Sequence, residues 1–383
     1  MGQGARVLVV GAGFAGAVHA RALAEAGYEV DVIEQRPHVG GNAYDEPAPT
    51  GERVHRYGPH LFHTSNTAVV DWLLRFGAFV PYEHRVQARL PGGAHVPLPI
   101  NRATIAAVFG VRLGDADAAQ AFLRAQAEPI PHPANAAEHL HATIGRVLTD
   151  LFFRPYTRKM WALELEELDA AVVKRIPLRF DDEARYFADD RFQLLPRDGY
   201  TVLFQAMLDH PRIRVTLNQA FDPGFLAGYA HCFNSMPIDA FFDQRFGPLP
   251  YRSIRFHHQM RHGKPPRGRA ATVNFTDHGP LTRETDWSLL PGPAPHGAHR
   301  TVTQEEPCAD HENGFERYYP VKTSDGRYQA AYARYKALAD ATPGLSFIGR
   351  CGTYQYLDMH QVINQSLTQV AAWCRVRDTA AAA

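Results

Sequence analysis

Residues 6–46, RVLVVGAGFAGAVHARALAEAGYEVDVIEQRPHVGGNAYDE, decide the fold class. The apolar run Arg6–Val10 predicts a fully buried strand, and three glycines follow it, Gly11, Gly13 and Gly16. Glycines at this spacing allow a tight turn, the close approach of a pyrophosphate and a close helix–strand contact. The free N–H groups at the start of the following helix favour an anion. The stretch therefore predicts a βαβ unit that binds a dinucleotide.

A second apolar run and a second glycine pair indicate which dinucleotide is bound. Tyr28–Ile33 predicts another buried strand, and it ends on Glu34, whose carboxylate can accept a hydrogen bond from a ribose 2′-hydroxyl. Arg36 nearby would suit a 2′-phosphate, but the carboxylate of Glu34 would repel that group. Residues 40–42, GGN, resemble the second glycine pair of flavoproteins with two dinucleotide domains. The expected cofactor is therefore FAD.

Composition narrows the class of partner and the compartment. The 383 residues suffice for two or three domains, and 40 basic residues balance 40 acidic ones, which gives no support to a nucleic-acid partner or an anionic membrane. The four cysteines are far apart and lack metal-ligand spacing, as expected for reduced thiols in a cytoplasmic protein without a metal. No apolar run reaches transmembrane length, so we expect no membrane insertion.

Periodicity along the chain predicts an α/β fold with two insertions. Residues 81–90 and 94–100 alternate like half-buried antiparallel strands, and 101–171 have helical spacing. Residues 174–180 and 185–196 predict strands, 199–208 a helix, and 292–296 and 310–314 loops. Strands of the first domain are expected at 212–216 and 231–233, antiparallel strands at 252–260 and 270–275, and a closing strand, turn and helix from residue 345 on. The expected division is a discontinuous Rossmann-like FAD-binding domain (1–78, 199–244 and 340–378), an inserted helical domain (100–172) and an antiparallel β-sheet substrate domain (79–99, 173–198 and 245–339).

Ordered segments through nearly the whole chain resemble the UDP-galactopyranose mutase family, FAD enzymes that interconvert the pyranose and furanose forms of UDP-galactose. They are GAGFAG, RPHVGGNAYDE, YGPHLFHTSN, FFRPYTRKMWALELEELDA, KRIPLRFDDEARYF, GYTVLF, PIDAFFD, LPYRSIRF, RYYPV and GRCGTYQYLDMHQVI. The resemblance implies an isomerisation without net redox change. Reduced flavin would attack the anomeric carbon through N5, displace UDP and hold the sugar while its ring opens and recloses. NAD(P)H or another reductant would prime the flavin.

The resemblance also implies a nucleotide-sugar site. Arg175 and Arg283 match the family's diphosphate-binding arginines, whose guanidinium groups suit phosphate oxygens; a structural ion pair is the alternative role for each. Aromatic residues that would pack against uracil and ribose are Phe152, Phe153, Tyr156 and Trp161, for which an aromatic core cluster is the alternative. Further substrate contacts are expected at Tyr186, Asn274, Tyr319, Tyr356 and Asp358.

Residues expected beside the flavin come from three segments. His60 and His63 resemble the histidine pair that faces the isoalloxazine ring, and Arg350 resembles an arginine that could favour the anionic reduced flavin. His63, Arg175, Arg283 and Arg350 are the candidate catalytic residues. Asp358 could instead cap the final helix. The cofactor contacts implied by the resemblance are Gly11, Gly13, Phe14, Gly16, Glu34, Gln35, Gly41, Asn42, His60, Arg350, Asp358 and Met359.

Departures from the family pattern leave the substrate open. Ala162 and Met236 replace glycines, Leu281 stands where a tyrosine often does, and Gln355 stands where some relatives carry arginine. A mutase for another nucleotide sugar is therefore one alternative. An FAD oxidoreductase of the amine-oxidase type and a flavin-binding protein without catalysis are two others. A homodimer and a role in cell-surface polysaccharide biosynthesis, through galactofuranose, complete the expectations.

Overall fold

A five-stranded parallel sheet holds the predicted dinucleotide-binding unit. The computed structural model describes residues 5–174 and 176–382. Strands that lie far apart in the sequence pair side by side here, in the order β10 (Ile213–Thr216), β2 (Glu29–Ile33), β1 (Arg6–Val10), β11 (His231–Asn234) and β17 (Leu345–Phe347). Helices α1 (Phe14–Glu25), α8 (Tyr200–Leu208) and α12 (Met359–Ala382) pack against this sheet in one hydrophobic cluster. The predicted βαβ unit and the returning C-terminal strand, turn and helix are confirmed.

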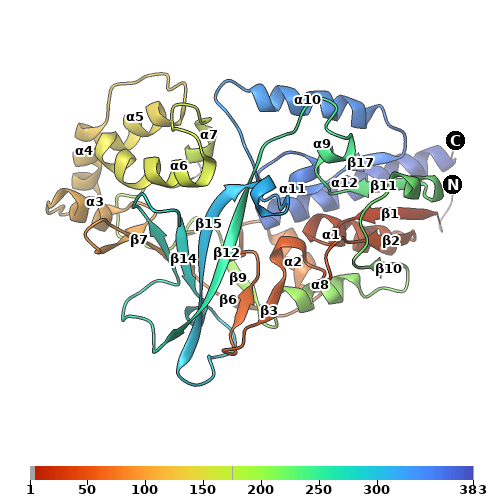
Figure 1. Ribbon diagram of the computed structural model, residues 1–383, viewed down its shortest axis with the longest axis horizontal. Helices are drawn as coiled ribbons and strands as arrows, with labels where there is room; N and C mark the ends of the chain where they lie inside the picture. The colour runs from red at the N-terminus through yellow and green to blue at the C-terminus, as the bar shows by residue number, and fades with distance from the viewer. Residues whose placement is uncertain (1–4, 175, 383) are drawn as a thin grey trace.

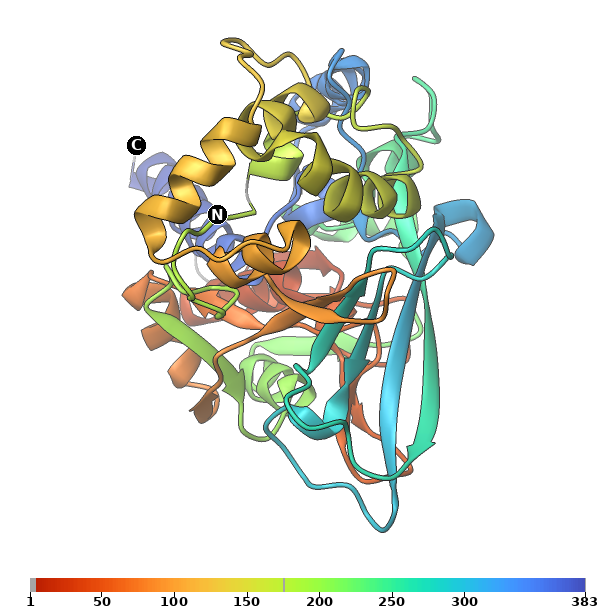
Figure 2. The same cartoon turned by 90° about the vertical axis from the view of Figure 1, so that its left-hand side faces the viewer.

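A seven-stranded sheet lies between the parallel sheet and the helical region (Figures 1 and 2). Its order is β16 (Tyr319–Pro320), β12 (Tyr251–His262), β15 (His299–Ala309), β14 (Arg283–Asp286), β13 (Thr272–Phe275), β7 (Val86–Arg89) and β8 (His95–Leu98). The prediction of an antiparallel sheet is wrong at one place, because β13 and β7 pair in parallel. Strand β7, which comes from an earlier segment of the chain, runs beside β13 in the same direction, so the sheet is mixed.

The helical region is a bundle whose hydrophobic core also takes in residues of the seven-stranded sheet, among them Ala88, Val96 and Ile254. It comprises α3 (Arg102–Phe109), α4 (Ala116–Gln126), α5 (Ala136–Leu148), α6 (Arg154–Trp161) and α7 (Ala171–Lys174). The side chains of Asn101, Asp115 and Asn135 accept backbone hydrogen bonds at the starts of α3, α4 and α5, which explains where these helices begin. A π-helical turn, Thr149–Phe153, joins α5 to α6 and contains Phe152 and Phe153.

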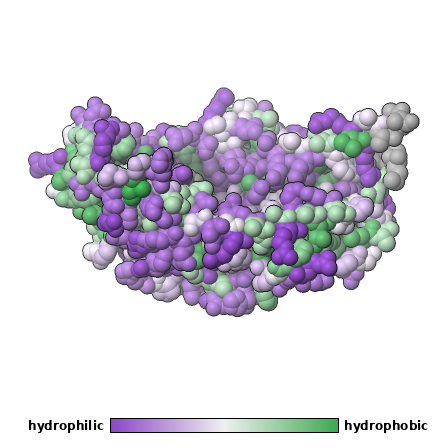
Figure 3. Space-filling model, turned by 90° about the horizontal axis from the view of Figure 1, so that it is seen from above, coloured by the Kyte–Doolittle hydropathy of each residue, from purple (hydrophilic) through white to green (hydrophobic). Residues whose placement is uncertain are grey.

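Two small sheets and several short helices complete the fold. The sheets are β5 (Phe62–Thr64), β9 (Phe192–Pro196) and β6 (Phe79–Pro81), and the pair β3 (Asp45–Pro47) with β4 (Arg53–His55). The remaining α-helices are α2 (Thr67–Leu74), α9 (Ile238–Phe241), α10 (Arg327–Asp340) and α11 (Gly349–Gly352). The face seen from above in Figure 3 is mostly hydrophilic, with apolar residues in scattered groups. Within the described residues, none of the helices combines the length and apolar character of a membrane span.

Three local expectations are wrong. The expected strand at 174–180 is absent from the described residues there; Pro177 lacks an N–H donor, and the N–H of Arg179 donates to the Ile100 carbonyl outside any sheet. Of residues 185–196, only Phe192–Pro196 forms a strand. The expected loop at 310–314 contains one 3₁₀ turn, Asp310–Asn313. The domain boundaries given above stay a prediction.

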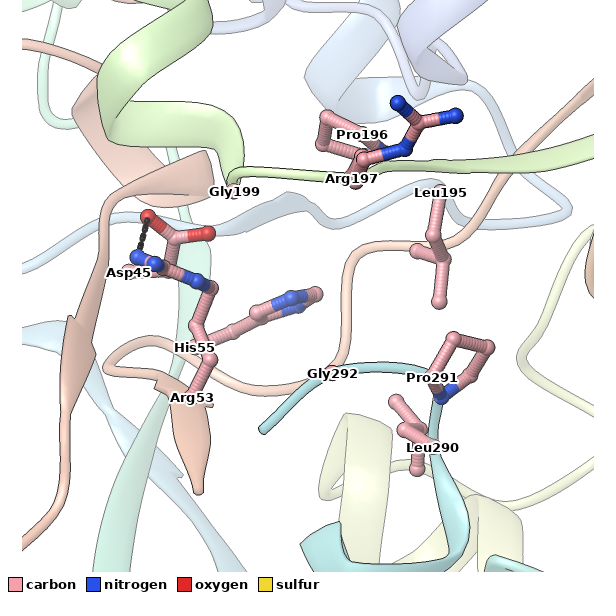
Figure 4. Close-up of a pocket in the computed structure, with 10 residues that line it drawn as sticks. All are labelled: Asp45, Arg53, His55, Leu195, Pro196, Arg197, Gly199, Leu290, Pro291 and Gly292. Carbon is pink, nitrogen blue, oxygen red and sulfur yellow. Dashed lines mark ion pairs between the residues drawn. The ribbon is translucent and has the colours of Figure 1, made fainter. Parts of the chain in front are cut away.

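Helix α8 takes its N-terminal cap from a distant strand. Gly199 at the N-cap position has no side chain, and the carboxylate of Asp45 accepts hydrogen bonds from Tyr200 N (2.6 Å) and Thr201 N (2.9 Å). The Asp45 side chain is fully buried, and Arg53 Nη1 lies 3.6 Å from it (Figure 4). The carboxylate therefore joins the β3–β4 pair to the parallel-sheet layer.

We expect Asp45→Ala to lower the free energy of unfolding by roughly 2–3 kcal/mol, because two buried N–H groups lose a charged acceptor. Denaturant titration followed by circular dichroism measures this loss. Asp209→Ala, at the exposed C-terminal end of the same helix, is the control and should change stability by less than about 0.5 kcal/mol. An equal effect of both substitutions would contradict the capping role of Asp45.

Candidate functional site

Two glycine segments approach each other too closely for side chains. A Cβ on Gly41 would lie 2.9 Å from the Gly13 Cα, and a Cβ on Gly16 would lie 1.8 Å from the Gly11 carbonyl oxygen. Gly11 also has a φ of +97°, a conformation that favours glycine. The glycines therefore allow close backbone packing around the start of α1, where the N-cap residue Gly13 supplies no side-chain hydrogen bond. We call this backbone arrangement the glycine cradle; the uncapped N–H groups at the start of α1 suit a diphosphate of a dinucleotide.

The predicted ribose carboxylate lies beside that cradle. Glu34 is 6% exposed, and its two oxygens accept hydrogen bonds from Ala12 N (2.8 Å) and Arg36 N (2.9 Å). The Arg36 guanidinium contacts Asn42, Glu316 and the ring of Tyr57, so both of its terminal nitrogens are engaged within the protein rather than presented to a 2′-phosphate. The local chemistry therefore fits a dinucleotide with a free ribose hydroxyl.

Cross-strand pairing assembles the predicted anion site. Arg283 lies opposite Asn274 on one neighbouring strand and opposite Glu305 on the other. Its Nη2 donates to Tyr156 Oη (2.8 Å), and its Nε lies 3.2 Å from Glu305 Oε2. A helix residue, Tyr156, is thus tied to the centre of the seven-stranded sheet.

The group formed by Asn274, Arg283 and Glu305 is charged, buried and incompletely hydrogen-bonded. The side chain of Glu305 is 3% exposed. Burial alone would lower the pKa of Arg283, but the attraction of Glu305 and Tyr156 raises that pKa well above the usual range, so the guanidinium keeps its charge. Asn274 Oδ1, Arg283 Nε and Glu305 Oε1 are buried without a hydrogen-bond partner among the described residues. Two of these atoms are acceptors and one is a donor, so water or a ligand that offers both kinds of group can complete their hydrogen bonds.

Lys159 holds the turn that joins the two strands of this group. Its Nζ donates to the carbonyls of Phe275 (2.8 Å), Asp277 (2.9 Å) and Leu281 (2.9 Å), and the side chain is 8% exposed. Burial lowers the pKa of Lys159, against the pull of the Asp277 carboxylate. Sequence reasoning missed this residue, although it lies inside the YTRKMW segment. The departure Leu281 contributes here through its backbone.

The predicted tyrosines and Arg350 form an adjoining stack. The rings of Tyr319 and Tyr356 stack at 5.4 Å, and the Arg350 guanidinium carbon lies 4.9 Å from the Tyr356 centroid. Trp161 meets Tyr319 edge to face at 6.3 Å. Arg350 donates to the carbonyls of Leu357 (3.1 Å from Nε) and Tyr318 (3.3 Å). Helix α6, strand β16 and the turn before α12 therefore meet here.

The two predicted histidines have different surroundings. His60 Nδ1 bonds the Gly58 carbonyl (2.8 Å), and burial, reinforced by His55 and Arg350, lowers the pKa of His60 to about 3, so the ring is neutral. His63 Nδ1 lies 2.6 Å from Asp190 Oδ2, and its ring stacks on Phe187 at 3.6 Å. Because a carboxylate only accepts, the proton between them lies on the His63 nitrogen.

Other predicted residues divide between core and surface. The Phe14 ring packs against Phe204 at 4.6 Å in the core, which leaves only its backbone to face a ligand. Phe152 is 7% exposed and belongs to the helical core with Phe153. Tyr186 N donates to the His84 carbonyl. Gln35 is exposed, Asp358 precedes the first residue of α12, Met359, and Arg175 lies outside the described residues.

The backbone N–H groups at the other departures from the family pattern donate to residues close by in the sequence. Ala162 ends α6 with a φ of +52°, where the family glycine would be unstrained. Met236 N donates to Asn234 Oδ1, and the Gln355 N–H donates to the Arg350 carbonyl.

Among the described residues that line two cavities of the structure, none is Arg283, Arg350 or one of the predicted tyrosines. A small one of about 20 Å³ lies against His55, Asp45 and Arg53 (Figure 4). It has room for one water molecule and none for a nucleotide. An open cleft of about 410 Å³ is lined by residues of the 178–189 segment, including Arg179 and Arg185.

The first matched segment defines the class of protein. Residues 9–76 match the model of an NAD(P)-binding Rossmann-like domain, in agreement with the glycine cradle and Glu34. The chain is thus an α/β protein with a dinucleotide-binding domain.

A second match gives the family. Residues 151–356 match the UDP-galactopyranose mutase model. The chain is similar to a Klebsiella pneumoniae "Probable UDP-galactopyranose mutase" (37% identity; 94% of this chain, 92% of the relative) and to an Escherichia coli dTDP-fucopyranose mutase (35%; 94% and 96%). A crystal structure of reduced UDP-galactopyranose mutase shares the fold, with a TM-score of 0.74 at 17% identity, over 96% of this chain and 93% of that one. The chain belongs to the UDP-galactopyranose mutase family, and mutases are isomerases.

Buried neutral histidines make the stability dependent on pH. Burial lowers the pKa of His19 and His231 to about 4 and that of His55, His60 and His84 to about 3. In the unfolded chain a histidine titrates at about 6.5. Below that pH the unfolded state binds protons that the folded state does not, so the stabilisation is complete above about pH 6.5 and is lost as the pH falls.

We expect His19→Leu, which removes one such group from α1, to flatten this loss by up to roughly 1.4 kcal/mol per pH unit between about pH 6 and 4.5. Denaturant titrations at several pH values measure the slope. His278→Leu, at an exposed histidine, should leave the slope unchanged. A parent protein whose stability is flat over this range would contradict the neutral state of the buried rings.

Proposed function

We propose that this chain is a flavin-dependent mutase that interconverts the pyranose and furanose forms of a nucleotide sugar, UDP-galactose or a close analogue. One observation carries the proposal: a charged guanidinium, Arg283, lies beside a tyrosine stack and among buried polar atoms that have no hydrogen-bond partner in the described part of the chain. A diphosphate would supply acceptors for the guanidinium. Hydroxyl or N–H groups of a nucleotide sugar would donate to the two acceptor oxygens, Asn274 Oδ1 and Glu305 Oε1. The edges of the neighbouring Tyr319 and Tyr356 rings would suit a sugar ring.

FAD is the cofactor that we propose for the glycine cradle. Gly11, Gly13, Gly16 and Gly41 would leave room for its diphosphate, and Glu34 would accept from a ribose hydroxyl. When bound and reduced, FAD supplies a nucleophilic N5 for the anomeric carbon, and NAD(P)H or another reductant would prime it. The remaining proposed cofactor contacts are Phe14, Gln35, Asn42, His60, Arg350, Asp358 and Met359.

The protein's own groups would bind, orient and balance charge. Arg283 and Arg175 would hold the diphosphate, with Tyr156 fixing the Arg283 guanidinium and Asn274 bonding the nucleotide or sugar. Phe153 would pack against uracil and ribose, supported by Phe152 and Trp161, which are each only 7% exposed in the same core.

Groups nearer the reacting carbon would have other roles. Tyr186, Tyr319, Tyr356 and Asp358 would line the phosphate and sugar site. Arg350 would favour an anion beside it, and neutral His60, whose Nδ1 donates to the Gly58 carbonyl, would offer Nε2 as an acceptor without adding charge. His63, held by Asp190, would present its second nitrogen as an acceptor.

The identity of the sugar nucleotide is the main alternative. The similarity to a dTDP-fucopyranose mutase is close to that of the UDP-galactopyranose relative, so a deoxy sugar and a thymidine nucleotide are the second candidate substrate. An amine-oxidase-like oxidoreductase would have no use for the Arg283 group. A cytoplasmic location, a homodimer and a polysaccharide role stay predictions.

The test of the anion site is substitution of its arginine in the dithionite-reduced protein. Loss of one charge-assisted phosphate contact is worth roughly 1.5–3 kcal/mol, so Arg283→Ala should reduce turnover of the nucleotide sugar about tenfold to over a hundredfold. Because alanine also leaves the buried Glu305 carboxylate unpaired, we expect this variant to melt at a lower temperature. Arg283→Lys keeps the charge and should separate binding from stability, with a raised KM and a fold like the parent. Arg175→Ala is expected to lose turnover similarly.

The matched control is Arg255→Ala, on the same sheet, which removes the pairing with Glu306 and Glu312 at a 38% exposed side chain. It should turn over substrate like the parent. Parental KM and turnover in both Arg283 variants would show that the diphosphate lies elsewhere.

A further inference from the structure

Arg36 lies where three segments of the proposed site meet. Its Nη1 donates to Asn42 Oδ1 (2.9 Å) in the second glycine segment, and its guanidinium carbon lies 4.3 Å from the ring centroid of Tyr57, which precedes the His60 loop. Its Nη2 forms an ion pair with Glu316. We call these four residues, Arg36, Asn42, Tyr57 and Glu316, the Arg36 junction.

The junction is sheltered from solvent. The side chains of Arg36 and Glu316 are 15% and 33% exposed. Burial alone would lower the pKa of Arg36, and Glu316 and Tyr57 more than offset that effect, so the guanidinium stays charged. The His38 ring bonds Tyr57 Oη (2.8 Å) and stacks on Tyr44, which fixes the position of Tyr57. Removing one partner therefore leaves a charge without compensation in a confined place.

Glu316 continues directly into the tyrosine stack. The next residue, Arg317, is anchored by Asp310 (2.9 Å) and Asp239 (3.0 Å), and the Tyr318 carbonyl accepts from Arg350. Tyr319 then stacks on Tyr356. Glu316 is thus the charged link between this stretch and the dinucleotide-binding loop, beside a ring contact of Tyr318 with Tyr57 at 6.4 Å.

Arg36 is equally well connected on the dinucleotide side. Its backbone N–H donates to Glu34 Oε1, the carboxylate proposed for the ribose, and its side chain donates to Asn42. A ligand that holds Glu34 and Asn42 in place also limits the motion of Arg36, and through the ion pair that of Glu316. The first ligand thereby bears the entropic cost of ordering these side chains. The second ligand does not bear that cost again and binds more tightly.

We propose that Glu316 is a positioning residue which, through Arg36, couples dinucleotide binding to nucleotide-sugar binding, so that each ligand tightens the other. The inference rests on the proposed function, since it takes the two ligands to be FAD and a nucleoside diphosphate. Such coupling is reciprocal by thermodynamic necessity.

The experiment measures FAD release from the holoenzyme. FAD freed on dilution is quantified by flavin fluorescence after ultrafiltration, with and without saturating UDP. We expect UDP to tighten FAD binding by about fivefold or more in the parent, the lower end of typical coupling. In Glu316→Gln the factor should fall to near one, and Glu316→Asp, which keeps the charge on a shorter side chain, should restore part of it.

The matched control is Glu306→Gln, which removes a carboxylate of similar exposure, 29%, that pairs with His257 and Arg255 on the neighbouring strand. It should keep the parental coupling. If the loss of a half-buried carboxylate reduced the coupling only by lowering stability, Glu306→Gln would reduce it as well. If Glu316→Gln fails to retain FAD, the comparison of Glu316→Asp with the parent decides. Undiminished coupling in the Glu316 variants, or no coupling in a parent that binds both ligands, overturns the inference. A parent that binds neither FAD nor UDP overturns the proposed function instead.

Discussion

The burial of the Arg283–Glu305 ion pair is the constraint on which the candidate site depends. Taking both charges out of water costs several kcal/mol per ion, and only good geometry and further hydrogen bonds offset that cost. Here Tyr156 of helix α6 accepts a hydrogen bond from Arg283, and the neighbouring strands supply Asn274 and Glu305. Among the described residues, Asn274 Oδ1 and Glu305 Oε1 have no hydrogen-bond partner. The sheet thus holds a buried cation beside acceptor oxygens, and in the proposed function a nucleotide sugar would complete their hydrogen bonds.

The dinucleotide cradle is built differently, from the absence of side chains. Gly13 and Gly41 approach so closely that any Cβ on Gly41 would collide with backbone. Polar groups then connect this cradle to the rest of the site. Glu34 holds the first turn, Arg36 joins it to Tyr57 and Glu316, and Asp45 caps α8 from the other side. In the proposed function, this backbone would position one ligand, and the charged side chains would link that position to the site of the second.

The dinucleotide-binding part of the fold could be predicted from local sequence patterns. The βαβ unit, the Glu34 position and the helix after Gly199 follow from periodicity and turn residues, which act within a few positions. The neighbours of Arg283 did not follow, because strand register joins residues 274, 283 and 305 across three strands. The strand expected at 174–180 failed since the backbone there bonds the segment before α3. Lys159, Asp190 and Glu316 were missed because their partners are backbone carbonyls or distant side chains. Family resemblance supplied the site residues that pattern alone did not, and their roles stay predictions.

The most direct test of the account is product analysis. FAD-loaded protein, reduced with dithionite, is incubated separately with UDP-galactopyranose and dTDP-fucopyranose, and the nucleotide sugars are separated by anion exchange. The account predicts conversion of at least one of them to its furanose form, only after reduction and without reductant consumed in proportion to product. No conversion of either sugar by the reduced holoenzyme, or stoichiometric consumption of NAD(P)H or oxygen during substrate oxidation, would contradict it.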